Sequence, residues 1–215
     1  MEYPTNDRNK VKRLPKRGHY DQETIFGILD DAFLCHVGSE IAGQPYVIPT
    51  AYGRDGEVLY LHGSSKSRMI QHLATGAPLC LTVTHLDGLV LARSAFHHSM
   101  NYRSAVIFGT ATLVEGEEKM HALEVISEQI LKGRWAEVRQ PNPTEMKATS
   151  VLRITIEQAS AKIRTGPPGD EAEDYALPIW AGVVPAELTF QDPLPDPAMD
   201  QAHELPASVK ALARK

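Results

Sequence analysis

The hydrophobic positions of this chain fall mostly in short runs bounded by turn residues, a pattern typical of β-strands. Two such runs, 33–38 and 44–63, are rich in β-branched and aromatic residues, and the second is interrupted by Asp55 and Gly56. An Asp-Gly pair tolerates the positive φ of a tight turn, so 44–63 is predicted to form a β-hairpin. Further strands are predicted over 78–93, as two strands around Asp87 and Gly88, over 102–115, with a bulge at Gly109, and over 149–164.

Three segments have the apolar spacing of helices instead. The first, 20–32, has Asp21 as its predicted N-cap. The second runs from about 65 to 75 and is expected to end at Gly76, a residue type that favours the left-handed C-cap conformation. The third, 117–131, has the strongest helical periodicity. Its predicted apolar stripe consists of Met120, Leu123, Ile126 and Ile130.

Strands linked by hairpins, with three helices inserted, favour an antiparallel barrel over a doubly wound parallel sheet. We therefore predict a mainly β fold with α-helical covers. Prolines punctuate the chain after about residue 183, and this end is expected to lie along the surface or to be mobile. The predicted organisation is a basic N-terminal arm over 1–18, a barrel domain over 19–184 and a Pro-rich acidic tail over 185–215.

Composition describes an ordinary soluble protein, with 215 residues, 42% hydrophobic residues and a net charge of -5. No run of about 18 apolar residues occurs, so no membrane association is expected. The N-terminus lacks the apolar stretch of a secretory signal, so export by that route is not expected. Cys35 and Cys80 are too few for a disulfide framework, and lone thiols are typical of the cytoplasm.

Charge is distributed unevenly along the chain. Residues 1–18 carry six Lys and Arg against two acidic residues, whereas 166–206 has nine acidic residues and neither Lys nor Arg. A basic arm can contact nucleic acid, but no platform with interleaved aromatic residues follows it here. A solvated basic terminus is the simpler interpretation, so nucleic acid is not expected as a partner.

Cations and hydroxyls gather at the predicted junction between a strand ending near His62 and a helix beginning near Lys66. The first turn of a helix leaves N–H groups without intrahelical partners, and the helix dipole there favours an anion. Arg68 adds a planar fork that can hold two phosphate oxygens. We interpret this turn as a phosphate site; the alternative is that Ser64 or Ser65 only caps the helix and the cations face solvent.

Pro49 lies in the middle of the strand 46–52, where it removes a ladder hydrogen bond. Such a proline is confined to an edge, a bulge or a place where the backbone faces something other than a strand. A flat ligand along this strand would fit that role. Neither G-x-x-x-x-G-K-[ST] nor G-x-G-x-x-G occurs in the chain, which argues against a nucleoside-triphosphate or Rossmann site.

With these segments in view, the chain resembles the FMN-binding split-barrel proteins related to pyridoxamine 5'-phosphate oxidase, in the branch that includes flavin-nucleotide-binding and nitroimidazole-resistance proteins. The resemblance covers residues 17 to about 184. It implies a split antiparallel β-barrel that forms a homodimer, with FMN in the cleft between subunits. The matching stretches are "RGHYDQETI", "CHVG", "GQPYVIPTAYGR", "LYLHGSSKSRM", "CLTVTHLDGLVLARSAFHHSMNYRSAVIFG", "ATSVLRITIEQASAKIRTGPP" and "LPIWAGV".

The resemblance also implies a set of cofactor-binding residues. The strand along the isoalloxazine ring supplies Val47, Ile48, Pro49 and Thr50. The phosphate turn supplies His62, Gly63, Ser64, Lys66, Ser67 and Arg68. Other segments supply Thr82 and Thr84 near the polar edge of the ring, Asn101 and Arg103, and Trp180 from a C-terminal segment that closes over the flavin. His62 is the candidate catalytic residue, because an imidazole beside the flavin can pass a proton.

One departure bears on the substrate. The R-x-H-x-R-type signature that binds substrate phosphate in the oxidase is replaced here by "RTGPPGDEAEDYALPIW", whose acidic residues would repel such a substrate. We therefore do not expect oxidation of pyridoxamine 5'-phosphate.

Metal binding is not expected either, because the adjacent His97 and His98 point to opposite faces of a strand. The favoured function is an FMN-binding oxidoreductase that takes electrons from a nicotinamide donor or a reductase and reduces a small aromatic or nitroaromatic acceptor. The alternatives are a flavin carrier or sensor without enzymatic activity, and a protein that holds FAD, deazaflavin or haem in the same cleft.

Overall fold

The computed structural model describes residues 1–199 and 203–212, and the chain divides into two compact units. Each unit is assembled from segments that lie far apart in the sequence. The first unit contains Met1–Asp31, Cys80–Phe108 and Glu157–Leu188. The second unit contains Ala32–Leu79, Gly109–Ile156 and Thr189–Lys215.

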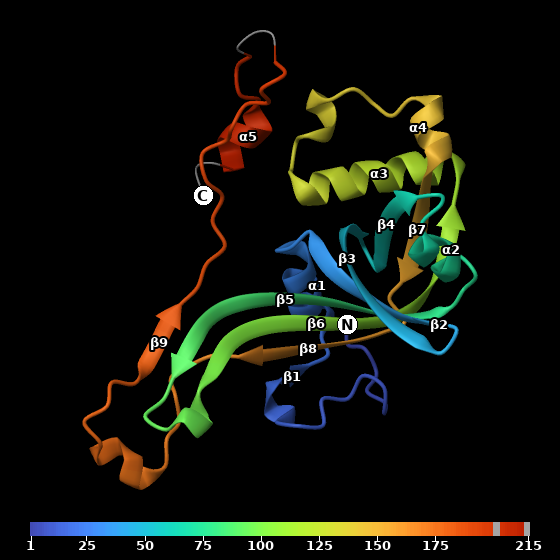
Figure 1. Ribbon diagram of the computed structural model, residues 1–215. Helices are drawn as coiled ribbons and strands as arrows, with labels where there is room; N and C mark the ends of the chain where they lie inside the picture. The colour runs from blue at the N-terminus through green and yellow to red at the C-terminus, as the bar shows by residue number, and fades with distance from the viewer. Residues whose placement is uncertain (200–202, 213–215) are drawn as a thin grey trace. The chain divides into compact units, whose positions relative to one another are not determined.

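The first unit is built on an antiparallel sheet in the order β1-β8-β6-β5-β9 (Figure 1). Its strands are β1 (Gly18–His19), β5 (Pro78–Leu91), the first part of β6 (Ser99–Val114), β8 (Gln158–Arg164) and β9 (Gly182–Pro185). The helix α1 (Gln22–Asp30) and the 3-10 turns η1 (Pro15–Arg17), η2 (Ala95–His97) and η4 (Ala172–Ala176) complete it.

The first predicted helix is confirmed, with Asp21 as its N-cap. Its carboxylate accepts a hydrogen bond from the N–H of Thr24 at 2.8 Å, and this bond lowers the pKa of Asp21. The apolar residues Ile25, Ile28 and Leu29 are buried. The carbonyl of Ile28, near the end of the helix, lies 2.9 Å from Nε2 of His85 on β5, which ties α1 to the sheet.

The predicted turn at Asp87 and Gly88 is wrong, because β5 runs through both residues as one strand. Gly88 is opposite Pro185 in the register of β5 and β9. A Cβ added to Gly88 would lie 2.9 Å from the carbonyl oxygen of Val184, so glycine serves here to let β9 approach. The carboxylate of Asp87 accepts from the guanidinium of Arg103 on the neighbouring β6.

The predicted strand over 149–164 is two strands, β7 (Thr149–Thr155) and β8, separated by Ile156 and Glu157. The long strand β6 explains the break. Its residues up to Phe108 pair with β8, and its residues from Ala111 pair with β7.

The second unit contains the sheet β2-β3-β4-β7-β6, also antiparallel. The predicted hairpin is confirmed, with Gly56 at φ 58° in its turn. Two short helices that the sequence pattern did not predict, α4 and α5, also belong to this unit. Its further elements are β2 (Leu34–Ile41), β3 (Gln44–Asp55), β4 (Val58–Ser64), α2 (Arg68–Leu73), α3 (Gly116–Ile130), η3 (Trp135–Glu137), α4 (Pro143–Ala148) and α5 (Ala207–Leu212).

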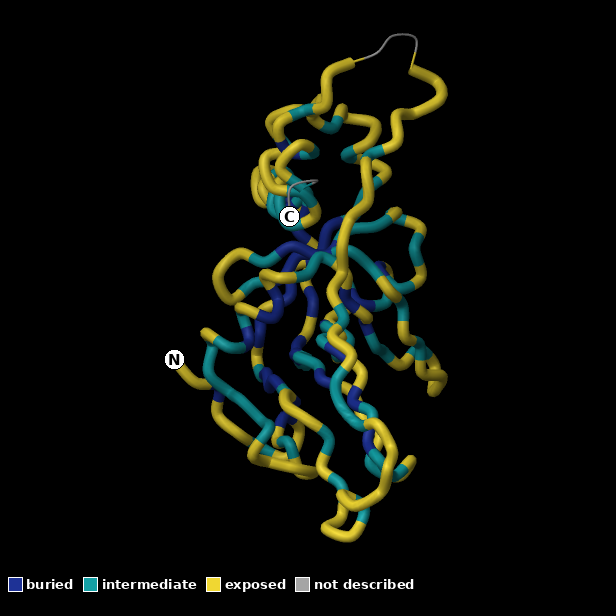
Figure 2. Tube along the Cα trace, turned by 90° about the vertical axis from the view of Figure 1, so that its left-hand side faces the viewer, coloured by how far each residue is buried: buried dark blue, intermediate teal, exposed yellow. Residues whose placement is uncertain are grey.

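Helix α3 lies across β3 and β4 (Figure 1), but the stripe predicted to be buried is partly wrong. Ile126 is buried as expected, whereas Ile130 is 43% exposed. Its other buried positions are Lys119 and Ala122, because the helix turns this side towards the sheet. The ammonium group of Lys119 pairs with Glu115 at 3.3 Å. Buried residues are concentrated in the strands (Figure 2).

Asp170 fixes the loop after β8 to the turn after β5 in the first unit. Its side chain has no exposed surface and accepts hydrogen bonds from the N–H of Arg93 at 3.0 Å, the N–H of Ser94 at 3.1 Å and Nη1 of Arg93 at 3.2 Å. Burial alone would raise the pKa of Asp170, but these donors outweigh it and the pKa is lowered. The carboxylate form is therefore the one that the fold stabilises.

Asp170→Asn is expected to be less stable than the wild type at neutral pH and to lose a pH dependence. Because the folded-state pKa of Asp170 is depressed, its contribution is fully present above its unfolded pKa of about 3.9 and is lost as pH falls through the lower folded value. The gap in unfolding free energy between wild type and variant should therefore shrink below about pH 4. Urea unfolding between pH 2.5 and 7 measures this; a gap independent of pH would contradict it.

Candidate functional site

The strand-to-helix turn differs in detail from the expectation. Strand β4 continues to Ser64, and α2 begins at Arg68 rather than at Lys66. Its N-cap is Ser67, whose hydroxyl accepts from the N–H of Ile70 at 3.4 Å, rather than Ser64 or Ser65. The helix is six residues long and is followed by Gly76 at φ 81°.

Most amides of the turn are used within the protein. The N–H of Ser65 donates to the carbonyl of Ala148 at 2.9 Å, and that of Ser67 donates to the carbonyl of Ser64 at 2.8 Å. The N–H of Lys66 donates to the hydroxyl of Ser64 at 3.2 Å. A phosphate at this turn would therefore be held mainly by side chains rather than by a row of vacant amides.

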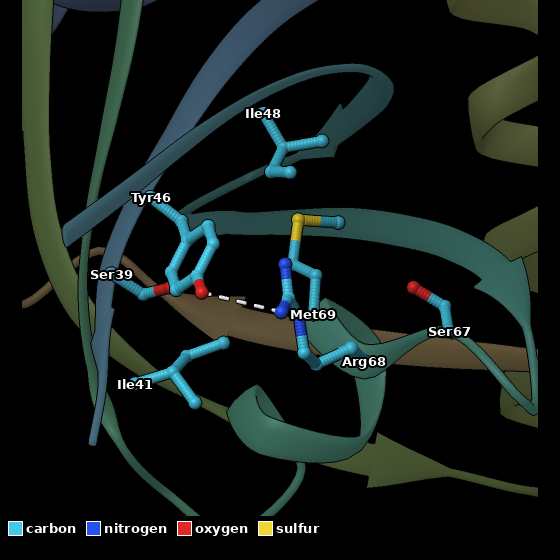
Figure 3. Close-up of a pocket in the computed structure, with 7 residues that line it drawn as sticks. All are labelled: Ser39, Ile41, Tyr46, Ile48, Ser67, Arg68 and Met69. Carbon is cyan, nitrogen blue, oxygen red and sulfur yellow. Dashed lines mark hydrogen bonds between the residues drawn. The ribbon is translucent and has the colours of Figure 1, made fainter. Parts of the chain in front are cut away.

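A cavity of about 150 Å³ lies beside the start of α2 (Figure 3). Its wall combines apolar side chains with hydroxyl groups and one guanidinium group. Three of its residues, Ile48, Ser67 and Arg68, belong to the predicted flavin site. The full lining is Ser39 and Ile41 from β2, Tyr46 and Ile48 from β3, and Ser67, Arg68 and Met69 at the start of α2.

Sequence reasoning missed four lining residues, and the strand pattern could have indicated three of them. Tyr46 is two positions before Ile48, so the two share a face of β3. Ser39 is opposite Tyr46 in the register of β2 and β3 and shares that face too. Ile41 follows Ser39 by two. The alternation of side chains along β2 and β3 therefore indicates Ser39, Ile41 and Tyr46. The position of Met69, in contrast, depends on where α2 begins.

Arg68 rests on the ring of Tyr46 inside this cavity. Its Cζ atom is 4.2 Å from the ring centroid, and its Nη1 donates to the hydroxyl of Tyr46 at 3.2 Å (Figure 3). A guanidinium above an aromatic ring is attracted by the quadrupole of that ring. The contact holds the planar fork in place while using one of its five donors, which leaves donors for an anion.

The predicted residues of β3 lie on both faces of the sheet. Tyr52 is opposite Leu61 in register, so Ile48 and Thr50 share the α2 face with Leu61 and Gly63. On the other face, Val47 is 68% exposed and Pro49 is exposed as well.

Gly63 has a packing role at the end of β4. A Cβ at this position would lie 2.9 Å from Cγ1 of Ile70, so glycine lets α2 approach the strand.

Pro49 is opposite His36, in the part of β3 that is paired with β2 rather than with β4.

His62 lies on the α3 face of the sheet together with Tyr60, which donates to Glu118 of α3 at 3.3 Å. It is therefore not part of the cavity lining. Its Nδ1 atom is buried without a hydrogen-bond partner, and burial lowers the pKa of the ring. A buried acceptor nitrogen costs less than a buried unpaired N–H group, so we assign the neutral form with the proton on Nε2.

The remaining predicted residues, Thr82, Thr84, Asn101, Arg103 and Trp180, belong to the first unit. Arg103 donates to Asp87 at 3.2 Å and to Asp31 at 2.8 Å, and the bond to Asp87 is the main cause of its raised pKa. Trp180 is 66% exposed.

Asn101 is buried, and its Nδ2 donates to the carbonyl of Gly166 at 3.2 Å. Thr82 is half-buried and Thr84 is exposed, two positions apart on β5.

Other kinds of site find little support in the residues that the structure describes. Over 1–199 and 203–212, no group of three or more His, Cys, Asp or Glu side chains could hold a metal ion. Within the same residues, no helix is long and apolar enough to cross a membrane. Burial raises the pKa of Cys35 to about 12, and it also raises the pKa of Cys80, so neither thiol is activated as a nucleophile.

The antiparallel sheets and the cation-bearing turn define the class of flavin-binding split-barrel proteins. The family model described as pyridoxamine 5'-phosphate oxidase matches residues 21–163, and the chain belongs to this family. The predicted fold class, a mainly β split barrel with helical covers, is confirmed. No protein of curated function matches the chain.

Three of the solved structures that are similar to this protein bear on its function. The flavocytochrome Anf3 from Azotobacter vinelandii is 41% identical, with a TM-score of 0.90 over 99% of both chains. The FAD- and heme-binding protein from Mycobacterium smegmatis is 36% identical, with a TM-score of 0.88 over 91% of this chain and 97% of its own. A putative 5-nitroimidazole antibiotic resistance protein from Bacteroides thetaiotaomicron is 26% identical, with a TM-score of 0.56 over 68% of this chain and 86% of its own.

Proposed function

We propose that this protein is a flavin-dependent oxidoreductase in which the turn at the start of α2 binds a phosphate group of the flavin. The observation that carries the proposal is the cavity that brings Arg68 and Ser67 together with Ile48. Arg68 supplies the planar donors, Ser67 lines the same wall and Ile48 supplies an apolar surface. Ring stacking on Tyr46 keeps the guanidinium extended across the cavity, so less side-chain entropy is lost when an anion binds.

FAD is the flavin that we favour over FMN, with haem as a second redox group. The structures of a flavocytochrome and of an FAD- and heme-binding protein are similar to this chain over at least 91% of its length. When bound, the flavin would accept a hydride and the haem would transfer single electrons.

His62 fits either group. A neutral imidazole with the proton on Nε2 can donate a hydrogen bond to a flavin, whereas binding to haem iron through Nε2 would require the other tautomer, with the proton on Nδ1. His72 is a second candidate, since its Nε2 is buried without a hydrogen-bond partner.

A homodimer is part of this proposal. The cavity of about 150 Å³ is smaller than the roughly 300–1,000 Å³ typical of ligand pockets, so it can enclose only part of a flavin. Another surface must cover the rest. Independently of the cavity, Val47 and Pro49 on β3 and Leu34 on β2 expose apolar atoms on the face of the sheet opposite to the cavity. Burial of this face against a second copy would remove apolar surface from water.

Identification of the bound cofactors tests this proposal. The purified protein should show flavin absorption between about 370 and 460 nm and, if haem is bound, an intense band near 410 nm. Mass spectrometry of the extract should give FAD rather than FMN. Reconstitution of the cofactor-free protein with each flavin completes the test. A protein that takes up neither flavin would overturn the proposal, whereas FMN alone would correct only the choice of flavin.

Reduction of a nitroaromatic acceptor is a second candidate function, favoured by the likeness to the putative nitroimidazole resistance protein. Steady-state oxidation of NAD(P)H by the reconstituted protein, with and without a nitroimidazole, distinguishes it from electron transfer to oxygen. A loaded protein that is reduced by NAD(P)H but turns over neither acceptor would instead be a flavin carrier or sensor.

A further inference from the structure

Arg164 ends β8 in the first unit as a buried cation. It is 8% exposed, and its guanidinium donates to Oδ1 of Asn101 and to the carbonyls of Gly166 and Pro167, both at 3.3 Å. All three acceptors are neutral. Within the residues that the structure describes, no carboxylate pairs with Arg164, in contrast to Arg103 on the adjacent strand, which contacts two.

A buried charge without a counter-charge is costly, because desolvation is not repaid by an opposite charge. Carbonyl dipoles compensate only part of that cost. Desolvation is the main cause of the lowered pKa of Arg164, and repulsion from a second cation, Arg17, lowers it further. The turn η1, which ends at Arg17, packs against β8, which ends at Arg164.

A constrained turn positions Arg17 beside the end of β8. It closes η1, and the residue before η1, Leu14, has a left-handed backbone with φ 56°. The next residue, Gly18, is opposite Lys162 in the register of β1 and β8, two positions before Arg164. A Cβ on Gly18 would lie 2.9 Å from Cβ of Val11, so the turn is closely packed.

Strained backbone of this kind is retained where the surroundings determine it, and it often accompanies a binding function. The side chain of Arg17 is half-buried and has no ion pair among the described residues. The chain thus holds two unpaired guanidinium groups near each other, with the half-exposed Arg17 as the accessible side.

We propose that Arg17 and Arg164 form a binding site for a phosphate group, with Asn101 as a positioning residue for Arg164. The planar forks of two arginines match the oxygens of a tetrahedral oxyanion. This site lies in the first unit, whereas Arg68 lies in the second, so the proposal does not depend on the flavin site. The phosphate belongs either to a free phosphorylated small molecule or to the bound cofactor.

The competing explanation is purely structural. Arg164 would then only fasten the loop after β8 through its contacts with Gly166 and Pro167. That explanation assigns no role to Arg17. Substitution of Arg17 therefore distinguishes the two explanations, because it leaves the hydrogen bonds of Arg164 to the loop in place.

The test is a titration of cofactor-free protein with inorganic phosphate at constant ionic strength, followed by calorimetry and thermal unfolding. The wild type should bind phosphate and be stabilised by it, while chloride has no effect. Arg17→Gln should weaken phosphate binding at least tenfold. Arg13→Gln removes the same charge from an exposed side chain of the same N-terminal segment and should bind like the wild type.

Two further variants sharpen the result. Arg164→Lys keeps the charge but loses the fork, and should also bind phosphate at least tenfold more weakly. The same series is repeated in the Arg68→Ala background, which removes the phosphate contact proposed at the start of α2, and the differences between the Arg17, Arg13 and Arg164 variants should remain. Equal behaviour of the Arg17 and Arg13 variants, or stabilisation by chloride as strong as by phosphate, would overturn the proposal. Loading the protein with flavin identifies the source: phosphate binding that disappears assigns the site to the cofactor, and binding that persists assigns it to a separate phosphorylated ligand.

Discussion

Gly53→Ala is expected to destabilise the second unit by about 3 kcal/mol, the upper end of the usual cost of overpacking a core. A Cβ at this position would lie 2.7 Å from the backbone nitrogen of Ile126 and 2.8 Å from its Cα. The obstacle is the backbone of α3, which cannot rotate out of the way as a side chain could. The helix would have to move away from β3 and open the cluster that Ile126 forms with Tyr60 and Val151.

A matched substitution gives the opposite sign. Gly27 lies within α1, and a Cβ added there meets nothing within 4 Å. Gly27→Ala should therefore stabilise the protein by about 0.5–1 kcal/mol, through helix propensity alone. Urea unfolding monitored by circular dichroism measures both variants. A Gly53→Ala protein as stable as the wild type would mean that α3 does not pack on β3 at the distance described.

Local chemistry made the hairpin and the first helix predictable from sequence. Asp55 and Gly56 form a turn that few other pairs can form, and Asp21 caps α1 through a bond to the third residue along. Both signals act over four or five residues, where backbone conformational preferences dominate. Because strands bounded by turn residues recur along the chain, the sequence also predicted a mainly β fold.

Features that depend on long-range strand pairing could not be predicted from the sequence in this way. The Asp87-Gly88 pair has the composition of a turn, yet it stays extended because β9 pairs with it from about 97 residues further along the chain. The segment 149–164, predicted as one strand, divides because its two halves pair with different parts of β6. The sequence pattern indicates the conformational preference of a segment, whereas the strands that pair with it determine whether it stays extended or divides.

The candidate site shows the same division. Arg68 was identified because a planar cation near a helix start suits a phosphate, and Ser67 was implied by the resemblance to the split-barrel family. Tyr46 was overlooked because its part depends on Arg68 lying across its ring, which is a contact between side chains 22 positions apart. Val47 and Pro49 were grouped with Ile48, although alternation along a strand places them on the opposite face.

Arg68→Ala should weaken flavin binding by about 10- to 150-fold, which corresponds to the roughly 1.5–3 kcal/mol of a charge-assisted hydrogen bond. Among the described residues that line the cavity, Arg68 is the one cation, and truncation at Cβ removes it along with its contact on Tyr46. The loss should appear in the dissociation constant measured by flavin fluorescence. It should be greater at low than at high ionic strength, since the removed interaction is partly coulombic.

Two further variants separate the contribution of the Arg68 guanidinium group to flavin binding from that of Tyr46 beneath it. Arg68→Lys keeps a positive charge without the fork and should lie between wild type and Arg68→Ala. Tyr46→Phe retains the ring beneath Arg68 but loses the hydroxyl that accepts at 3.2 Å, so it should cost less than tenfold. Arg153→Ala removes a guanidinium on the α3 face, where it pairs with Glu118 at 3.7 Å, and serves as the control. If Arg68→Ala and Arg153→Ala bind flavin equally well, the phosphate lies elsewhere, and the cavity beside α2 has another occupant.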